Sequence, residues 1–281
     1  MRVTFCGTRG STPAPGIEFV RYGGHTSCVA LAPDGLGSSP LLLLDAGTGI
    51  RRLKELLGDQ PFRGSVLLTH LHWDHVQGLP FFTNGDREDA AVSLFLPPED
   101  DETDAEALLE RMMSPPFFPI TPSQLRGDWR FGLVPSGSFE AEGFEVQARE
   151  IPHKGGRTFG FRVSDGHSSV AYLPDHCPTV LGTGPDGIGE YHESALALAR
   201  EVDILIHDAH LRAEEVPAEG FFGHAAAEYA VGLGTAAGAR LVALFHHRPD
   251  RTDTEVDRTL CRFADGPVPV IGAEEGRTLS L

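Results

Sequence analysis

Six consecutive positions of the chain carry four side chains that can bind a metal ion. His70, His72, Asp74 and His75 lie within the stretch Thr69-His70-Leu71-His72-Trp73-Asp74-His75. His70 and His72 are two residues apart, so on extended backbone their imidazoles point to the same side. Imidazole and carboxylate groups are the ligands that divalent zinc, manganese and iron prefer. The stretch therefore predicts a metal site rather than a chance group of surface histidines.

This histidine stretch resembles the H-x-H-x-D-H signature of the metallo-β-lactamase superfamily, and the resemblance extends over nearly the whole chain. Later positions that match further ligands of that family are His153 in Ile151-Pro152-His153-Lys154, Asp175 in Tyr172-Leu173-Pro174-Asp175 and His246 in Leu244-Phe245-His246-His247. The resemblance implies that one metal ion is held by His70, His72 and His153. It implies that a second ion is held by Asp74, His75 and His246. Asp175 would bridge the two ions.

Two more motifs resemble one branch of this superfamily, the transfer-RNA 3′-processing endonucleases and cyclic phosphodiesterases. They are Ile206-His207-Asp208-Ala209-His210 and Gly223-His224-Ala225. The resemblance implies that Asp208 orients His224, and that His224 stabilises or protonates the leaving oxygen. A carboxylate that holds an imidazole in this way sets its tautomer. Ala225 departs from the hydroxyl residue common in the family, so His224 could instead only begin the following helix.

For several residues near the predicted ligands, the sequence allows more than one role. His247 adjoins His246, and only one of them is expected to bind the metal. His176 adjoins Asp175 and could contact the substrate or lie on the surface. Asp45 is expected to tie down the histidine stretch, with a simple turn at a strand end as the alternative. Ordinary histidines, exposed or hydrogen-bonded, are expected at positions 25, 167 and 192.

Apolar runs that alternate with helical segments predict an α/β fold. The resemblance implies an αββα sandwich, in which two mixed β-sheets are flanked by helices. Strands are expected near 29–32, 41–44, 66–69, 144–151, 159–163, 169–173, 204–206, 241–245 and 268–271. Helices are expected near 50–57, 193–201, 225–237 and 254–263. We expect a single domain over 1–281, with about 83–128 as an insertion or lid over the site. A solvated surface excursion is the alternative for that segment.

The amino-acid composition limits which classes of partner and which cellular compartment are expected for the protein. The 281 residues include 40 acidic and 23 basic side chains, for a formal net charge of −17. A long nucleic acid needs many Lys and Arg contacts to its phosphates, so such a partner is not expected. The sequence contains no apolar run long enough for a transmembrane helix. The four cysteines are widely spaced and suit a reducing cytoplasm.

These observations predict a dinuclear metal-dependent hydrolase that cleaves a small phosphodiester, such as a cyclic nucleotide or cyclic sugar phosphate. Two divalent ions, zinc first and manganese, iron or nickel as alternatives, would share a water and lower its pKa, and the resulting hydroxide would attack phosphorus. Asp74, Asp208 and His224 are the residues expected in catalysis. Alternatives are a transfer-RNA 3′-end endonuclease, a lactone, ester or amide hydrolase, and a non-catalytic metal-binding biosynthesis protein. The resemblance is also compatible with a homodimer.

Overall fold

The computed structural model describes residues 1–35, 39–100, 102–184 and 186–281, which form two seven-stranded sheets. The first sheet has the order β14 (Thr278–Ser280), β1 (Arg2–Gly7), β2 (Cys28–Ala32), β3 (Leu42–Leu44), β4 (Arg63–Leu67), β5 (Ala91–Leu96) and β6 (Asp128–Leu133). The second has the order β13 (Val270–Gly272), β12 (Val242–Phe245), β11 (Ile204–Asp208), β10 (Ser169–Leu173), β9 (Phe159–Ser164), β8 (Phe144–Glu150) and β7 (Gly137–Ala141). Both sheets mix parallel and antiparallel pairs.

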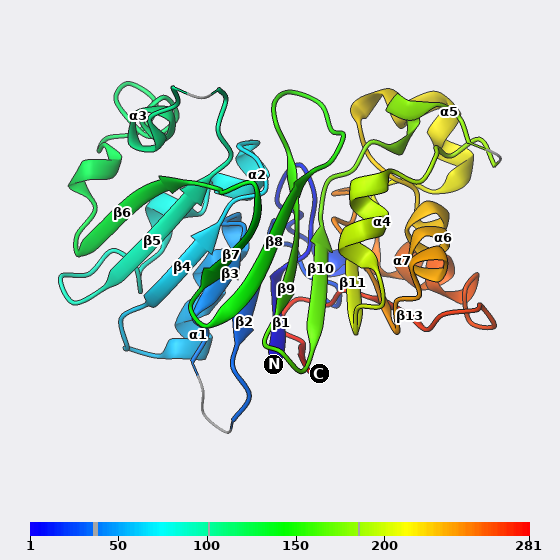
Figure 1. Ribbon diagram of the computed structural model, residues 1–281, viewed down its shortest axis with the longest axis horizontal. Helices are drawn as coiled ribbons and strands as arrows, with labels where there is room; N and C mark the ends of the chain where they lie inside the picture. The colour runs from blue at the N-terminus through cyan, green and yellow to red at the C-terminus, as the bar shows by residue number, and fades with distance from the viewer. Residues whose placement is uncertain (36–38, 101, 185) are drawn as a thin grey trace.

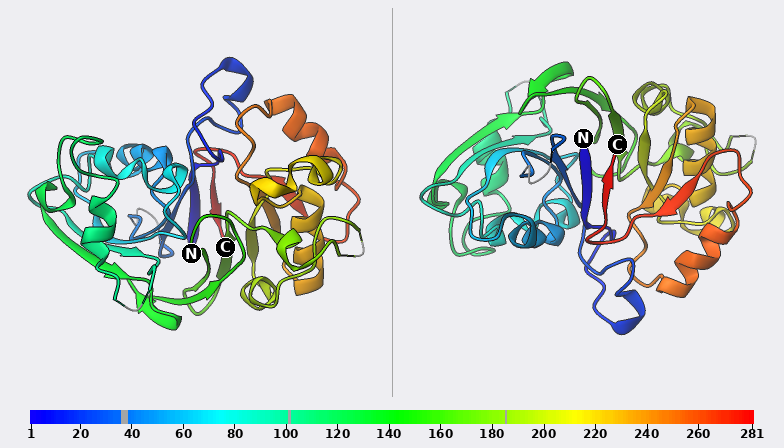
Figure 2. Two further views of the ribbon diagram at one scale, coloured as in Figure 1. Left: turned by 90° about the horizontal axis from the view of Figure 1, so that it is seen from above. Right: turned by 90° about the horizontal axis from the view of Figure 1, so that it is seen from below.

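Helices cover the outer face of each sheet (Figures 1 and 2). The α-helices are α1 (Leu53–Leu57), α2 (Trp73–Val76), α3 (Ala105–Glu110), α4 (Glu193–Ala199), α5 (Val216–Glu219), α6 (Ala227–Ala237) and α7 (Asp253–Cys261). Short 3₁₀ helices span Ile17–Phe19, Thr48–Arg52, Leu79–Phe81, Pro122–Gln124, Pro178–Leu181, Ala213–Glu215 and Gly220–Phe222. None of the described helices is long and apolar enough to cross a membrane. The expected αββα sandwich is therefore confirmed.

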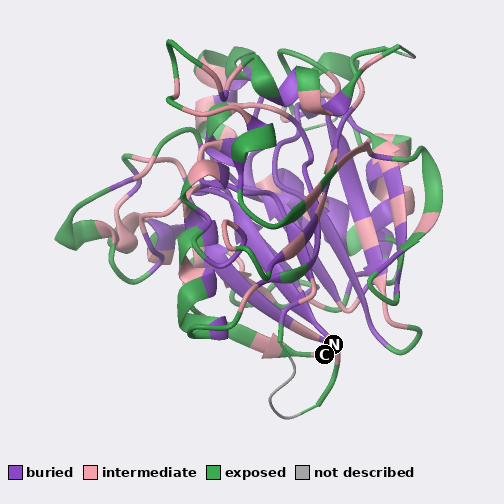
Figure 3. Ribbon diagram, turned by 90° about the vertical axis from the view of Figure 1, so that its left-hand side faces the viewer, coloured by how far each residue is buried: buried purple, intermediate pink, exposed green. Residues whose placement is uncertain are grey.

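Three hydrophobic clusters explain the layers. One lies between the sheets and includes Phe5 of the first sheet and Phe245 of the second, whose ring centroids are 6.3 Å apart. The other two fill the space between each sheet and its helices. Burial of these apolar side chains is the main favourable term in folding. Figure 3 shows the buried residues concentrated along the strands, with exposed residues on the outer helices and loops.

Strand direction determines where the loops meet. β3 and β4 run parallel, as do β10, β11 and β12. β8 is antiparallel to β9, which is antiparallel to β10, so β8 runs in the direction of β10. The carboxyl ends of parallel strands lie at one edge of a sheet, which is where α/β proteins place their sites. All loops that carry the predicted ligands leave from such ends.

Part of the segment 83–128 belongs to the first sheet, whereas we expected the whole segment to be an insertion or lid. Its residues Ala91–Leu96 form β5, which pairs with β4 and β6 inside the first sheet. That part is scaffold rather than an insertion. β5 is apolar at every position except Ser93, so the sequence does carry a strand signal that the expectation of an insertion overlooked. Beyond β5, Met112 and Phe117 line a pocket together with Trp73, so this part does lie beside the histidine stretch.

We expect Phe5→Ala to lower the free energy of unfolding by about 3–5 kcal/mol, because Phe5 is fully buried between the sheets. Urea denaturation followed by circular dichroism measures the change. Phe117→Ala is the matched control, since Phe117 is 82% exposed, and it should alter the free energy by less than about 0.5 kcal/mol. Equal losses in the two variants would contradict this description of the core.

Candidate metal centre

The seven predicted ligands converge where loops from both sheets meet. They are His70, His72, Asp74, His75, His153, Asp175 and His246, and they form overlapping groups whose donor atoms lie within 4.8 Å of one another. The first four follow β4, and the others follow β8, β10 and β12. Strand ends thus bring together side chains up to 176 positions apart in the sequence, which rigid scaffolds commonly do for loop-built sites.

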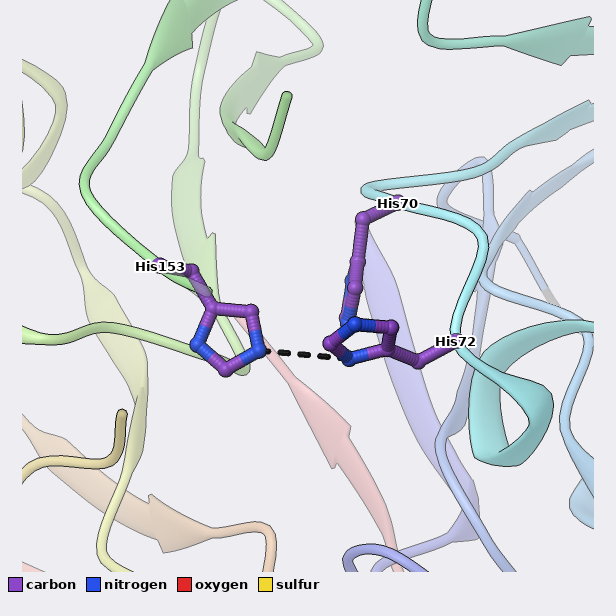
Figure 4. Close-up of side chains that lie close together, drawn as sticks. All are labelled: His70, His72 and His153. Atoms are coloured by element: carbon purple, nitrogen blue, oxygen red, sulfur yellow. Dashed lines mark hydrogen bonds between the residues drawn. The ribbon is translucent and has the colours of Figure 1, made fainter. Parts of the chain in front are cut away.

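The first group consists of three imidazoles, shown in Figure 4. Nε2 of His153 lies 3.3 Å from Nδ1 of His72. His70 completes the group, with its ring centroid 4.4 Å from that of His72 and 5.0 Å from that of His153. Burial lowers the pKa of all three imidazoles, which therefore favour the neutral form. A neutral imidazole offers the lone pair that a metal ion needs.

The second group lies beside the first and adds a carboxylate. Nε2 of His246 is 3.0 Å from Oδ2 of Asp74 and 3.4 Å from Nε2 of His75. Burial alone would raise the pKa of the Asp74 carboxyl, but His75 and His246 hold it well below its usual range. The backbone N–H of Ser11 donates a hydrogen bond of 2.7 Å to the same carboxylate. The sequence could not indicate this contact, because it comes from the backbone rather than a side-chain type.

Asp175 faces both groups at once. Its Oδ1 lies 3.5 Å from Nε2 of His153, and its Oδ2 lies 2.9 Å from Nε2 of His75 and 3.2 Å from Nε2 of His246. One carboxylate oxygen is thus directed to each group. This is the arrangement that a bridging ligand between two ions requires.

The donor set fits divalent metal ions. Nε2 of His70 is buried and has no hydrogen-bond partner among the described residues, and Oδ2 of Asp175, although close to two imidazole nitrogens, forms no hydrogen bond of normal geometry with them. Buried polar atoms without partners are unfavourable and rare in folded proteins. A cation among these atoms would satisfy them, and nitrogen and oxygen donors of this kind suit zinc, manganese or iron.

Asp45 connects the centre to both sheets. Its Oδ1 accepts a hydrogen bond of 2.7 Å from the backbone N–H of Thr69. Its Oδ2 accepts from Nδ1 of His75 at 2.7 Å and from the hydroxyl of Tyr172 on β10 at 2.9 Å. The expectation that Asp45 ties down the histidine stretch is confirmed. His153 is oriented in a similar way, because its Nδ1 donates to the carbonyl of Gly223 at 2.7 Å.

The contacts of His246 and His247 differ. His246 faces Asp74 and Asp175, whereas Nε2 of His247 donates to the carbonyl of Ala273 at 3.1 Å. His246 has a left-handed backbone with φ of 57°, which turns its ring back towards the centre. Gly10 permits this position, because a Cβ at residue 10 would lie 2.3 Å from the His246 ring.

Asp208 and His224 meet as expected at the rim of the centre. Nδ1 of His224 donates to Oδ2 of Asp208 at 3.2 Å and lies 3.5 Å from Oδ1 of Asp175. Burial would lower the pKa of His224, but the Asp208 carboxylate outweighs it and raises that pKa to about 9. His224 precedes α6, which begins at Ala227, so it is not the first residue of that helix.

The remaining histidines divide into two sets. His176 is fully buried, so the surface interpretation is wrong, and its Nδ1 lies 3.0 Å from Nε2 of His207. His210 ends the motif Ile206-His207-Asp208-Ala209-His210, and the sequence alone indicates no function for it. In the structure it is buried against His224. Half-buried His25 and His192 and exposed His167 lie outside the metal centre.

A cleft of about 750 Å³ opens beside the centre. Its floor contains His72, His153 and His224, and its walls include Phe19 and Phe222. This volume falls in the range of pockets for small ligands. A smaller opening lined by Trp73, Asp74 and Asp175 adjoins it and leads directly to the metal ligands.

Comparisons with known proteins agree with the fold and show the family. A family model described as "Beta-lactamase superfamily domain" matches residues 41–247. Ribonuclease Z of Methanothermobacter thermautotrophicus is 26% identical over 294 residues, which covers 91% of this chain and 89% of the relative. The metallo-beta-lactamase fold protein YhfI from Bacillus subtilis aligns with a TM-score of 0.71 at 17% identity, over 99% of each chain. A diphosphatase from the PhnP family aligns with a TM-score of 0.66 at 19% identity, over 100% of this chain and 97% of the other.

We expect His246→Gln to reduce the zinc content of dialysed protein from about two ions per chain to about one, because the second group loses a donor. Inductively coupled plasma mass spectrometry measures the content. His247→Gln is the matched control on the neighbouring residue and should keep the wild-type content. The reverse result would assign the last ligand to His247.

We expect Asp45→Asn to weaken zinc binding by about 10–100-fold, because residues that orient metal ligands commonly contribute that much. Competition with a chromogenic chelator measures the affinity. Tyr172→Phe removes only one of the hydrogen bonds to the same carboxylate and should cause a smaller loss. Wild-type affinity in Asp45→Asn would show that the ligands need no support from this side chain.

Proposed function

We propose a function for this chain from one premise: the chain belongs to the beta-lactamase superfamily and is a metal-dependent hydrolase. The proposed reaction is hydrolysis of a small phosphodiester, such as a cyclic nucleotide or cyclic sugar phosphate. The observation that carries this proposal is His224, which Asp208 holds beside Asp175 at the edge of the cleft. Phosphodiester cleavage needs a group that stabilises the leaving oxygen, and a positioned imidazole supplies it.

The two ligand groups would hold two divalent ions, with zinc proposed first. When bound, such ions supply Lewis-acid stabilisation of the phosphoryl oxygens and a water of lowered pKa. The protein residues would keep this arrangement rigid. Asp45 fixes the tautomer of His75, and the Gly223 carbonyl fixes that of His153. Each of these two imidazoles then directs its other nitrogen, Nε2, towards Asp175.

His224 would act on the opposite side of the scissile bond from the attacking water. Asp208 accepts a hydrogen bond from its Nδ1, which leaves Nε2 as the nitrogen that can meet substrate. The backbone N–H of Ala225 donates to the same carboxylate at 3.0 Å and limits rotation of the pair. His224 also lines the cleft, so a substrate lying there would place an oxygen within its reach.

A second candidate function, transfer-RNA 3′-end cleavage, is favoured by the similarity to ribonuclease Z. That similarity puts in doubt our expectation that a long nucleic acid is not a partner. The charge of the cleft and of the whole chain supports a small phosphodiester rather than a transfer RNA as the substrate. Arg248 lines the cleft but is paired with Glu219 and with Asp250, which leaves less of its charge for phosphates. The whole chain carries a formal net charge of −17.

We expect zinc-loaded protein to hydrolyse bis(p-nitrophenyl) phosphate and at least one cyclic nucleotide. His224→Ala should lower kcat on the cyclic nucleotide by about 10²–10⁴-fold, the usual contribution of a positioned acid or base. Release of p-nitrophenolate and chromatography of the nucleotide products measure the two reactions. His167→Ala, which changes an exposed histidine outside the centre, serves as the control and should match the wild type.

Two results would contradict the proposal. If loaded protein cleaves no diester but opens lactones or esters, the hydrolase acts on carbonyl carbon instead. If it cleaves a precursor transfer RNA after the discriminator base and leaves the cyclic nucleotides intact, the second candidate function replaces the first. Retained diesterase activity in His224→Ala would remove His224 from the reaction while leaving the metal centre in place.

A further inference from the structure

A second imidazole lies against His224 and has no assigned role. His210 stands at the end of β11, and its ring stacks on that of His224 with centroids 4.2 Å apart and planes 18° apart. One ring nitrogen from each of His210, His224 and His246 falls within 4.8 Å of the others. His210 also lines the same cleft as His224. The two rings therefore form one pair beside the metal centre.

The backbone fixes the place of His210 firmly. Its N–H donates to Oδ1 of Asp208 at 2.9 Å, so the carboxylate that holds His224 also holds this residue. Its carbonyl accepts a hydrogen bond of 3.1 Å from Nη2 of Arg251. Arg251 is itself buried and paired with Glu215 at 2.7 Å. Such support from residues behind a side chain is typical of groups that must keep their position in a site.

The side chain of His210, in contrast, is left without a partner. The residue is only 8% exposed, and its Nδ1 is buried with no hydrogen bond. Within the described part of the chain, neither ring nitrogen forms a hydrogen bond to another protein group. Native structures rarely leave buried polar atoms unsatisfied, and the exceptions commonly mark places where a ligand binds. A rigid, unpartnered imidazole on the wall of a cleft is such an exception.

We propose that His210 is a second catalytic imidazole, which donates a hydrogen bond to the leaving oxygen of the substrate together with His224. The inference rests on the proposed phosphodiesterase function. One ring nitrogen of His210 and one of His224 lie within 4.8 Å of each other, and both residues line the cleft, so the two rings are close enough for donors from both to approach one substrate oxygen. An oxygen between His210 and His224 would therefore contact both.

The reaction step balances as ordinary hydrolysis. The oxygen of water forms a bond to phosphorus, while the bond from phosphorus to the leaving oxygen breaks and its electron pair stays on that oxygen. His224 gives the leaving oxygen a proton, and the proton lost by the water replaces it. His210 gives up no proton. It only stabilises the charge that develops on the leaving oxygen, as donors in an oxyanion hole do.

The experiment compares two esters of thymidine 5′-phosphate, the p-nitrophenyl ester and the methyl ester. p-Nitrophenolate leaves with little help, whereas methoxide needs stabilisation. We expect His210→Phe, which keeps a stacked ring without a donor, to lower kcat on the methyl ester by about 10–100-fold. On the p-nitrophenyl ester the loss should stay below about threefold. His210→Gln, which keeps a donor, should recover part of the activity on the methyl ester.

Two measurements besides activity accompany the comparison. Zinc content by mass spectrometry and thermal unfolding should be the same in His210→Phe as in the wild type. A loss of zinc would identify His210 as a metal ligand and overturn the proposal. An equal loss of kcat on both esters would also overturn it, because the residue would then act through the fold. If the wild type cleaves neither ester, the proposed function fails first and this inference fails with it.

Discussion

The buried carboxylate of Asp45 is the contact on which the metal centre most depends. It stands directly after β3 and holds Thr69, His75 and Tyr172 through hydrogen bonds of 2.7–2.9 Å. Thr69 begins the histidine stretch of the first sheet, and Tyr172 belongs to the second. Because the ligands come from both sheets, their mutual distances depend on how the sheets meet. Asp45 fixes that relation at the point nearest to the metal ligands.

A second buried carboxylate organises the other side of the cleft. Asp208 accepts hydrogen bonds from the backbone of His176, His210 and Ala225 and from the side chain of His224. It stands at the end of β11, which pairs with β10 and β12, the strands that precede Asp175 and His246. A single charged group at the middle of the parallel edge therefore aligns the loops on both sides. Such a charge is tolerable in the interior because both carboxylate oxygens accept hydrogen bonds.

The sequence predicts those strands and ligands whose signal lies in a short run of neighbouring residues. The histidine stretch places four ligand-type residues within six positions, and strands such as β10 are buried along their whole length and are rich in apolar residues. Both patterns can be recognised in the sequence. The edge strand β6 has no buried residue and β7 has one, and β14 is three residues long, so none forms a recognisable apolar run. Which of His246 and His247 faces Asp74 and Asp175 depends on one left-handed residue. No pattern of residue types encodes that backbone turn.

The proposed chemistry of the centre does not by itself select the size of the substrate. Two ions and a leaving-group imidazole, as we propose, would serve a cyclic nucleotide and a transfer RNA equally well, since each presents one scissile phosphodiester. A long RNA adds binding energy only through phosphates beyond that bond, and each such contact needs a free cation. At the cleft, Arg248 is engaged by two carboxylates. An RNA phosphate would have to displace Glu219 and Asp250 from that guanidinium before it gained the contact.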